Sequence, residues 1–128
     1  MTTTLPPIIV GDADHATLCD LVDACADVQG DVAGYLEREL DRASVVPADR
    51  VPPGVVTMNA RLSFRDDRTG EVRAATLVYP GEADIAAGRI SVMTPVGAAL
   101  IGLAEGQSIA WQTRRGEQRA LTVLAVAR

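Results

Sequence analysis

Thirteen residues in the last third of the chain predict a strand, a cap and a helix in immediate succession. They read Ile90-Ser-Val-Met-Thr-Pro-Val-Gly-Ala-Ala-Leu-Ile-Gly102. Proline has no amide donor and a preset φ, so Pro95 suits a first helical turn, and the Thr94 oxygen before it can accept from free amides. The small residues 97–99 let the helix lie close against a sheet. The segment therefore predicts a rigid strand–helix corner, which is suited to docking and carries no catalytic chemistry.

Two apolar stripes at helical spacing predict a pair of helices within residues 1–46. The first helix should run from Asp12, its expected N-cap, to about Asp27, and the second should begin at Asp31 after Gln29-Gly30. The stripes recur every three or four residues. Their members are Leu18, Leu21, Val22 and Cys25 in the first helix, and Val32, Leu36, Leu40 and Ala43 in the second. The short link between them predicts a short antiparallel hairpin, a coiled-coil-like arm.

A proline-rich segment, residues 47–54, separates this arm from the rest of the chain. It reads Pro47-Ala-Asp-Arg-Val-Pro-Pro-Gly54, a composition that excludes a helix or a central strand and predicts a stiff linker. Residues 55–128 then alternate strand and turn signals. The expected strands are 55–64, 71–79, 107–113 and 117–127, with turns at 66–70 and 114–116. We therefore predict an α+β fold in which an antiparallel sheet packs on the short helix 95–101.

Charge is distributed unevenly along the chain, whose formal net charge is −5. Residues 1–46 contain nine acidic side chains against Arg38 and Arg42, a balance of −7, whereas residues 47–128 contain eight against ten arginines, a balance of +2. The chain has no lysine, so every basic group is a guanidinium that can contact carboxylates in bidentate fashion. Nonspecific duplex binding depends on phosphate neutralisation, so we expect no direct DNA recognition.

The residue types needed for several chemistries are missing. Without lysine there is no phosphate-binding loop ending in Gly-Lys, and the chain has no G-x-G-x-x-G. His15 is the one histidine and is expected at the surface. Cys19 and Cys25 are ~9 Å apart along a helix, too far for a disulfide, and cannot complete a zinc set. We expect free thiols, no cofactor, no metal site and no catalytic residue.

Membrane and secretion signals are also missing. No apolar run approaches the roughly 20 residues of a membrane span, and the first residues show neither a basic start nor an apolar secretory core. The sequence therefore predicts a cytoplasmic protein without a membrane partner.

The corner sequence resembles a known signature. Ser91-Val-x-Thr-Pro95 followed by Ala-Leu-Ile-Gly102 is similar to the C-terminal domain of Gre-type transcript-cleavage factors, and Leu62-Ser-Phe-Arg with Thr69-Gly-Glu71 resembles the first hairpin of that domain. Three further segments resemble the regulator of nucleoside diphosphate kinase (Rnk) family. They are Val55-Val-Thr-Met-Asn-Ala-Arg61, Leu77-Val-Tyr-Pro80 and Pro95-Val-Gly-Ala-Ala-Leu100. The likeness is strong over residues 55–128 and limited to layout over residues 1–46.

The resemblance implies a function as well as a fold. It implies an FKBP-like Gre-type C-terminal domain over residues 55–128 that binds RNA polymerase at the rim of its secondary channel. The surface expected to dock consists of Ser91, Met93, Thr94 and Pro95, while the core takes Val92, Val96, Leu100 and Ile101. The leading hypothesis is a non-enzymatic regulator of transcription elongation that competes with Gre-type factors and affects nucleoside diphosphate kinase indirectly.

The tip of the arm departs from the Gre-type pattern. The resemblance to Gre-type factors implies a long helical hairpin whose tip acids hold a catalytic magnesium. In this chain the tip reads Asp27-Val-Gln-Gly-Asp31. From Asp12 to Gly30 the first helix reaches only ~28 Å, and the paired acids at D-x-x-E spacing are missing. We expect Asp20, Asp23 and Asp27 to form a solvated face and expect no stimulation of transcript cleavage.

Two other functions stay open at this level. Similarity in fold to FK506-binding proteins implies a peptidyl-prolyl isomerase, for which Phe64, Tyr79 and Trp111 are the aromatic residues of the domain. Direct regulation of a nucleotide kinase is the other alternative. The oligomeric state, the sign of the transcriptional effect, the genes affected and the contacts of the acidic tip are likewise open.

Overall fold

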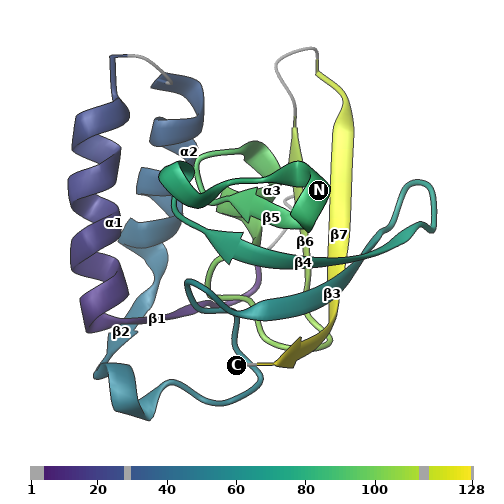
Figure 1. Ribbon diagram of the computed structural model, residues 1–128, viewed down its shortest axis with the longest axis horizontal. Helices are drawn as coiled ribbons and strands as arrows, with labels where there is room; N and C mark the ends of the chain where they lie inside the picture. Colours follow the sequence, from purple (N-terminus) through teal and green to yellow (C-terminus); the bar gives the residue numbers. More distant parts are fainter. Residues whose placement is uncertain (1–4, 28–29, 113–115, 128) are drawn as a thin grey trace.

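The computed structural model describes residues 5–27, 30–112 and 116–127. Within these residues, two helices and a short parallel strand pair form the arm, and a curled sheet with a third helix forms the rest (Figure 1). The helices are α1 (Asp12–Cys25), α2 (Gly30–Arg42) and α3 (Pro95–Leu100). The strands are β1 (Ile9–Gly11), β2 (Ser44–Val46), β3 (Arg61–Asp66), β4 (Val72–Val78), β5 (Arg89–Ser91), β6 (Ser108–Gln112) and β7 (Gln118–Ala127).

The predicted helices of the arm are confirmed as α1 and α2, with shifted ends. The prediction that Asp12 is the N-cap is wrong by one residue: Gly11 occupies the cap position, and Asp12 is the first residue of the helix. The cap has no side-chain hydrogen bond. Each stripe is buried at its centre, at Leu18 and Val22 in α1 and at Leu36 and Leu40 in α2. The helices lie side by side (Figure 1), and His15 Nε2–H donates to the Leu40 carbonyl at 3.1 Å. Asp20, Asp23 and Asp27 are exposed, as predicted.

A parallel pair of three-residue strands, β1 and β2, ties the two ends of the arm together. The sequence does not predict this pair, because runs of three residues have no measurable period. Ile8, just before β1, is 1% exposed, and its carbonyl accepts from Ser44 N at 2.9 Å. The neighbouring Ile9 N donates to the Gly102 carbonyl at 3.1 Å. The base of the arm is thereby hydrogen-bonded directly to the segment that follows α3.

The proline-rich linker contains one turn of 3₁₀ helix, η1 (Ala48–Arg50), so the prediction that no helix forms there is wrong. A single such turn needs only one i→i+3 bond, here from Arg50 N to the Pro47 carbonyl at 2.8 Å. The turn is held against the arm, because Ala48 N donates to Asp12 Oδ1 at 3.1 Å. The linker is therefore an ordered part of the structure.

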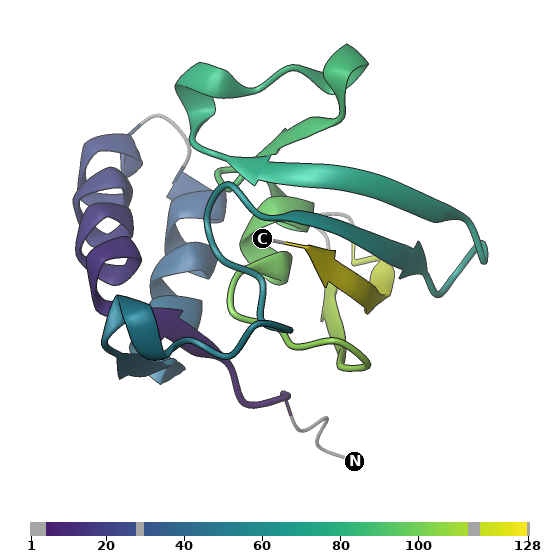
Figure 2. The ribbon, with the colours of Figure 1, turned by 60° about the horizontal axis from the view of Figure 1, so that its bottom comes forward.

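The larger sheet has the order β5-β4-β3-β7-β6. Three of the predicted strands are found as β4, β6 and β7, and the fourth, predicted over 55–64, is found shifted as β3 at Arg61–Asp66; their pairings are antiparallel. The prediction of an entirely antiparallel sheet is wrong at one edge, since β5 pairs with β4 in parallel. The chain between them crosses over through two 3₁₀ turns, η2 (Pro80–Glu82) and η3 (Ile85–Ala87), which project beyond β4 (Figure 2). A parallel pair cannot be joined by a tight hairpin.

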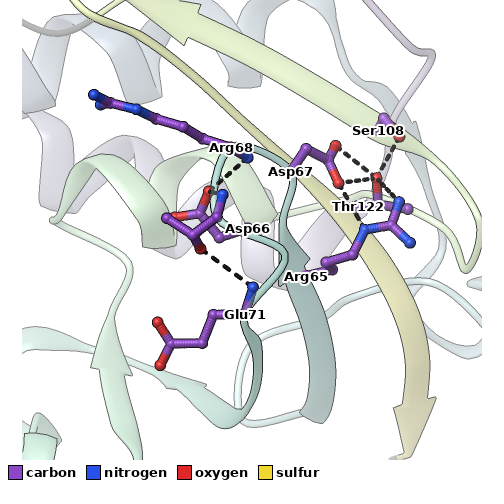
Figure 3. A network of polar contacts seen from close by, with 8 residues as sticks. Arg65, Asp66, Asp67, Arg68, Glu71, Ser108 and Thr122 are labelled. Atoms are coloured by element: carbon purple, nitrogen blue, oxygen red, sulfur yellow. Dashed lines mark hydrogen bonds and ion pairs between the residues drawn. The ribbon is translucent and has the colours of Figure 1, made fainter.

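A network of polar contacts fixes the turn between β3 and β4 (Figure 3). Asp67 accepts from Arg65 Nε at 2.9 Å and from the Thr122 hydroxyl at 2.8 Å, and Ser108 Oγ lies 2.6 Å from the same hydroxyl oxygen. The network therefore joins the end of β3 to β7 and β6. The predicted turn at 66–70 is found here, whereas residues 114 and 115 of the other predicted turn lie outside the described residues.

One contiguous apolar core runs from the arm into the sheet. It includes Leu18 and Leu36 of the arm, Leu77 of β4 and Leu100 of α3, each 0% exposed. Figures 1 and 2 show α3 between α2 and the curled sheet. Helix α3 is thus packed from both sides, and the arm is held at a defined position. Among the described residues, no helix is both long enough and apolar enough to cross a membrane.

Candidate functional site

The strand–helix corner has the geometry that the sequence predicts. Thr94 is the N-cap of α3 and its Oγ1 accepts from Gly97 N at 3.1 Å, while Pro95 occupies the first turn. The Thr94 hydroxyl also donates to the Ser91 carbonyl at 2.7 Å. This one side chain therefore joins the end of β5 to the start of α3 and fixes the angle between them.

Gly97 permits the closest approach in this corner. A Cβ atom placed on it would lie 2.0 Å from the carbonyl oxygen of Ser91, a distance that no packing adjustment of side chains relieves because the clash is with backbone. The expectation that small residues let the helix lie close to the sheet is confirmed at this position.

The predicted exposure of Ser91 and Met93 is wrong. Met93 is 3% exposed and Ser91 is 9% exposed. The strand ends at Ser91, whose Oγ accepts from Met93 N at 3.0 Å, so the chain turns and the alternation of inward and outward side chains does not continue. Of the four residues assigned to docking, Pro95 is exposed and Thr94 is half-buried. The accessible part of the corner is therefore Thr94, Pro95 and the half-buried Val96.

Thr94 and Val96 line a cavity of about 570 Å³, here called the corner cavity. Its walls come from β3, β4, the η2–η3 loop, β5, α3, β6 and β7. Apolar side chains dominate the lining, among them Phe64, Ile90, Val96, Trp111 and Leu121. Cavities of this size and composition are typical binding sites.

The rim of the corner cavity carries arginines. Arg73, Arg89 and Arg119 line it, against one acidic side chain, Asp66. Arg119 Nη2 donates to Asp66 Oδ2 at 3.1 Å. Hydrogen bonding from the Arg68 amide holds the pKa of Asp66 below its ordinary value, and the charge of Arg119 acts in the same direction. The rim is therefore net positive at neutral pH.

Ile85 is the most exposed large apolar side chain described, at 91%. It belongs to η3, where Asp84 caps the turn by accepting from Ala87 N at 3.3 Å, and it lines the corner cavity. A well-ordered turn thus holds an isoleucine in solvent at the mouth of an apolar hollow. Sequence reasoning missed Ile85 and the arginines of the rim, because strands and loops distant in sequence supply them and none forms a local pattern.

The acidic tip of the arm lies on different elements from the corner. Asp27 follows α1 and Asp31 lies in the first turn of α2; both are exposed, and residues 28 and 29 of the predicted tip lie outside the described residues. Within the described ranges no three His, Cys, Asp or Glu side chains are grouped as a metal ion would need. Cys19 and Cys25 are both free thiols, as predicted.

The chain is similar to known proteins of the Gre-type class. Residues 51–128 match the family described as "Transcription elongation factor, GreA/GreB, C-term", and residues 6–46 match "Rnk N-terminus". A solved structure, "Prokaryotic transcription elongation factor GreA/GreB from Nitrosomonas europaea", is similar over 96% of this chain and 99% of its own, with 36% identity and a TM-score of 0.73. The mixed α+β fold with its curled sheet is therefore that of the Gre-type factors.

Relatives that match most of this chain identify the family within the Gre-type class. "Regulator of nucleoside diphosphate kinase" of Escherichia coli K12 is 43% identical over 93% of this chain and 88% of its own length. "Transcription elongation factor GreA" of Nitratidesulfovibrio vulgaris (strain DSM 19637 / Miyazaki F) is 35% identical over 73% of this chain and 61% of its own. The chain belongs to the Rnk family and joins an Rnk N-terminus to a GreA/GreB-type C-terminal domain.

Proposed function

We propose that this protein is a non-enzymatic regulator of transcription elongation that binds RNA polymerase near its secondary channel and competes there with Gre-type factors. The observation that carries the proposal is the corner cavity, an apolar hollow with an arginine rim on a domain of the Gre type. The relatives named as transcription elongation factors share this domain, which supports the elongating enzyme, RNA polymerase, as the partner.

The chemistry of the cavity indicates what the partner presents. Isolated exposed apolar residues are common, but Ile85 stands beside a large apolar hollow, and such a combination marks a protein-docking site. Arg73 is paired with Glu71 at 3.3 Å, whereas Arg89 has no ion pair with a described residue and favours a segment that carries an acidic side chain beside an apolar tip. Pro95 and Thr94 provide a rigid edge at the side of the hollow. Docking therefore uses the surface next to the predicted corner, with Ser91 and Met93 supporting it from the core.

The length and charge of the arm favour a mechanism in which the protein occupies the channel entrance and performs no catalysis there. Helix α1 has 14 residues and is about 21 Å long; its exposed face carries Asp20 and Asp23, and the exposed Asp27 follows its last turn. An arm of this length and charge repels nucleic-acid phosphates or contacts basic polymerase surface. We propose that Asp27 and Asp31 act through charge alone. Changes in nucleoside diphosphate kinase then follow indirectly from altered transcription.

A competition experiment tests the proposal. Purified protein is expected to co-purify with core RNA polymerase, and a purified Gre-type factor added in increasing amounts should displace it. Bovine serum albumin added in the same amounts serves as the control for nonspecific loss. Binding that the Gre-type factor leaves unchanged would contradict the shared site. Co-purification with nucleoside diphosphate kinase in the absence of polymerase would favour direct regulation of that enzyme.

Peptidyl-prolyl isomerisation is the second candidate, because Phe64 and Trp111 both line the corner cavity. Tyr79, the remaining aromatic residue of the domain, is not among the lining residues. A coupled proline-peptide assay separates the two functions, since an isomerase accelerates isomerisation without polymerase. We expect no acceleration, because the rim arginines and Ile85 favour a folded protein partner over a short peptide.

A further inference from the structure

A second cavity, here called the junction cavity, lies between the arm and the sheet and has a volume of about 330 Å³. Its walls come from α2 and from β6, together with Leu5 ahead of β1. The side chains that matter chemically are Tyr35, Arg38, Glu39, Arg42 and Trp111. The cavity is thus lined by two guanidinium groups, two aromatic rings and one carboxylate.

Two hydrogen-bond donors of this cavity are buried without an acceptor. Arg42 donates from Nε to Glu39 and from Nη1 to the Pro6 carbonyl, but its Nη2 has no partner among the described residues. The indole Nε1 of Trp111 likewise has no partner in the described part of the chain. Buried donors of this kind are rare in folded proteins, and each is unfavourable unless an acceptor is supplied. Arg42 and Trp111 both line the junction cavity, so a ligand there with acceptor oxygens could satisfy these donors after a small side-chain movement.

The charge of the cavity favours an anion. Glu39 is only 3% exposed and is neutralised by its ion pair with Arg42. Arg38 is exposed and forms no ion pair with a described residue, so the cavity keeps one uncompensated positive charge. Burial, and then the charge of Glu39, raise the pKa of Tyr35, which keeps its phenol protonated at neutral pH. The Tyr35 hydroxyl is hydrogen-bonded to Glu39, so the donors left for a ligand are the guanidinium groups and the indole.

We propose that the junction cavity binds a small oxyanion, a carboxylate or phosphate group attached to a planar apolar body. The anionic oxygens accept from Arg42 Nη2 and Trp111 Nε1 and pair with Arg38, because guanidinium groups hold both kinds of oxyanion well. The planar body lies against the rings of Tyr35 and Trp111. This site shares Trp111 with the corner cavity, but its arginines lie on α2 and are not part of the proposed polymerase-docking surface.

A ligand bound in the junction cavity should also stabilise the packing of the arm against the sheet. The cavity walls belong to α2 on one side and to β6 on the other, so a bound ligand bridges the arm and the sheet. A ligand that binds only the folded state raises its stability. The ligand should therefore raise the melting temperature of the whole chain and fix the position of the arm.

The unique tryptophan supplies a direct reporter, because the indole of Trp111 gives a single Nε1–H signal in a ¹⁵N-labelled sample. The full chain is titrated separately with benzoate and with inorganic phosphate. A saturable shift of the indole signal with either probe is expected, and the probe that produces it distinguishes the carboxylate from the phosphate class. Absence of a saturable shift with both probes would overturn the proposal.

Matched arginine variants locate the bound probe, since Trp111 also lines the corner cavity. Arg38→Gln changes only the junction cavity and should weaken binding about tenfold, as loss of a charge-assisted bond does. Arg89→Gln changes only the corner cavity and should leave the affinity unchanged. Both side chains are exposed, so both variants should fold. The reverse pattern, or equal losses, would overturn the assignment to the junction cavity.

Discussion

Gly97→Ala is expected to destabilise the protein by more than about 3 kcal/mol. The added Cβ would lie 2.0 Å from the Ser91 carbonyl oxygen and 2.8 Å from the Val92 Cα. Both atoms are backbone, so relief requires α3 to move away from β5. That movement would open the core around Leu100, which is fully buried. Urea unfolding followed by circular dichroism measures the loss.

Gly34→Ala is the matched control for this prediction. Gly34 lies inside α2, and the nearest atom to an added Cβ is the flexible Arg38 Nη1 at 3.5 Å, an ordinary contact. Alanine is the better helix former by about 1 kcal/mol, so this variant should be more stable than the parent chain. Equal stability of Gly97→Ala and the parent would show that α3 does not approach β5 as described.

Met93→Asp is expected to lower the free energy of unfolding by about 4 kcal/mol, the range reached when an unpaired charge is buried. Met93 is 3% exposed within the core cluster, and its own amide is engaged with Ser91 Oγ. Met93→Leu, which keeps an apolar side chain of similar volume, should cost less than about 1.5 kcal/mol. Thermal denaturation of the three proteins measures the difference.

Two outcomes would contradict this account of Met93. A Met93→Asp variant as stable as the parent would return Met93 to the surface and restore it to the docking residues. If Met93→Leu destabilised the protein as much as Met93→Asp, the loss would come from the changed shape of the side chain and not from its charge.

Local patterns predicted the elements of this fold well. The threonine–proline step determined the cap and first turn of α3, and the apolar stripes located α1 and α2, because caps and periodicity depend on neighbouring residues. The four long strands were predicted for the same reason. The resemblance of residues 55–128 to Gre-type factors was likewise confirmed.

What failed depended on contacts between distant segments. Period-two alternation placed Met93 at the surface, but the strand stops at Ser91 and the next residues turn inward. The parallel pairings of β1 with β2 and of β4 with β5 involve runs of three residues, too short to show a period. The corner cavity gathers side chains from seven segments, so no stretch of sequence describes it. The burial of Glu39 was also missed, because its partner Arg42 is held by the carbonyl of Pro6, 36 residues away in the sequence.

If the corner cavity binds core RNA polymerase as proposed, the equilibrium affinity for core polymerase should depend on the side chain at the cavity mouth. Ile85→Asp alters a 91% exposed side chain at the cavity mouth, and Val72→Asp introduces the same charge at a 57% exposed position on β4 outside the lining. Both variants should keep the parent's melting temperature. We predict that Ile85→Asp weakens binding at least about 30-fold, as loss of a central apolar contact does, and that Val72→Asp leaves it unchanged. Equal affinity of the parent and Ile85→Asp for core polymerase, or no binding by the parent, would contradict the account.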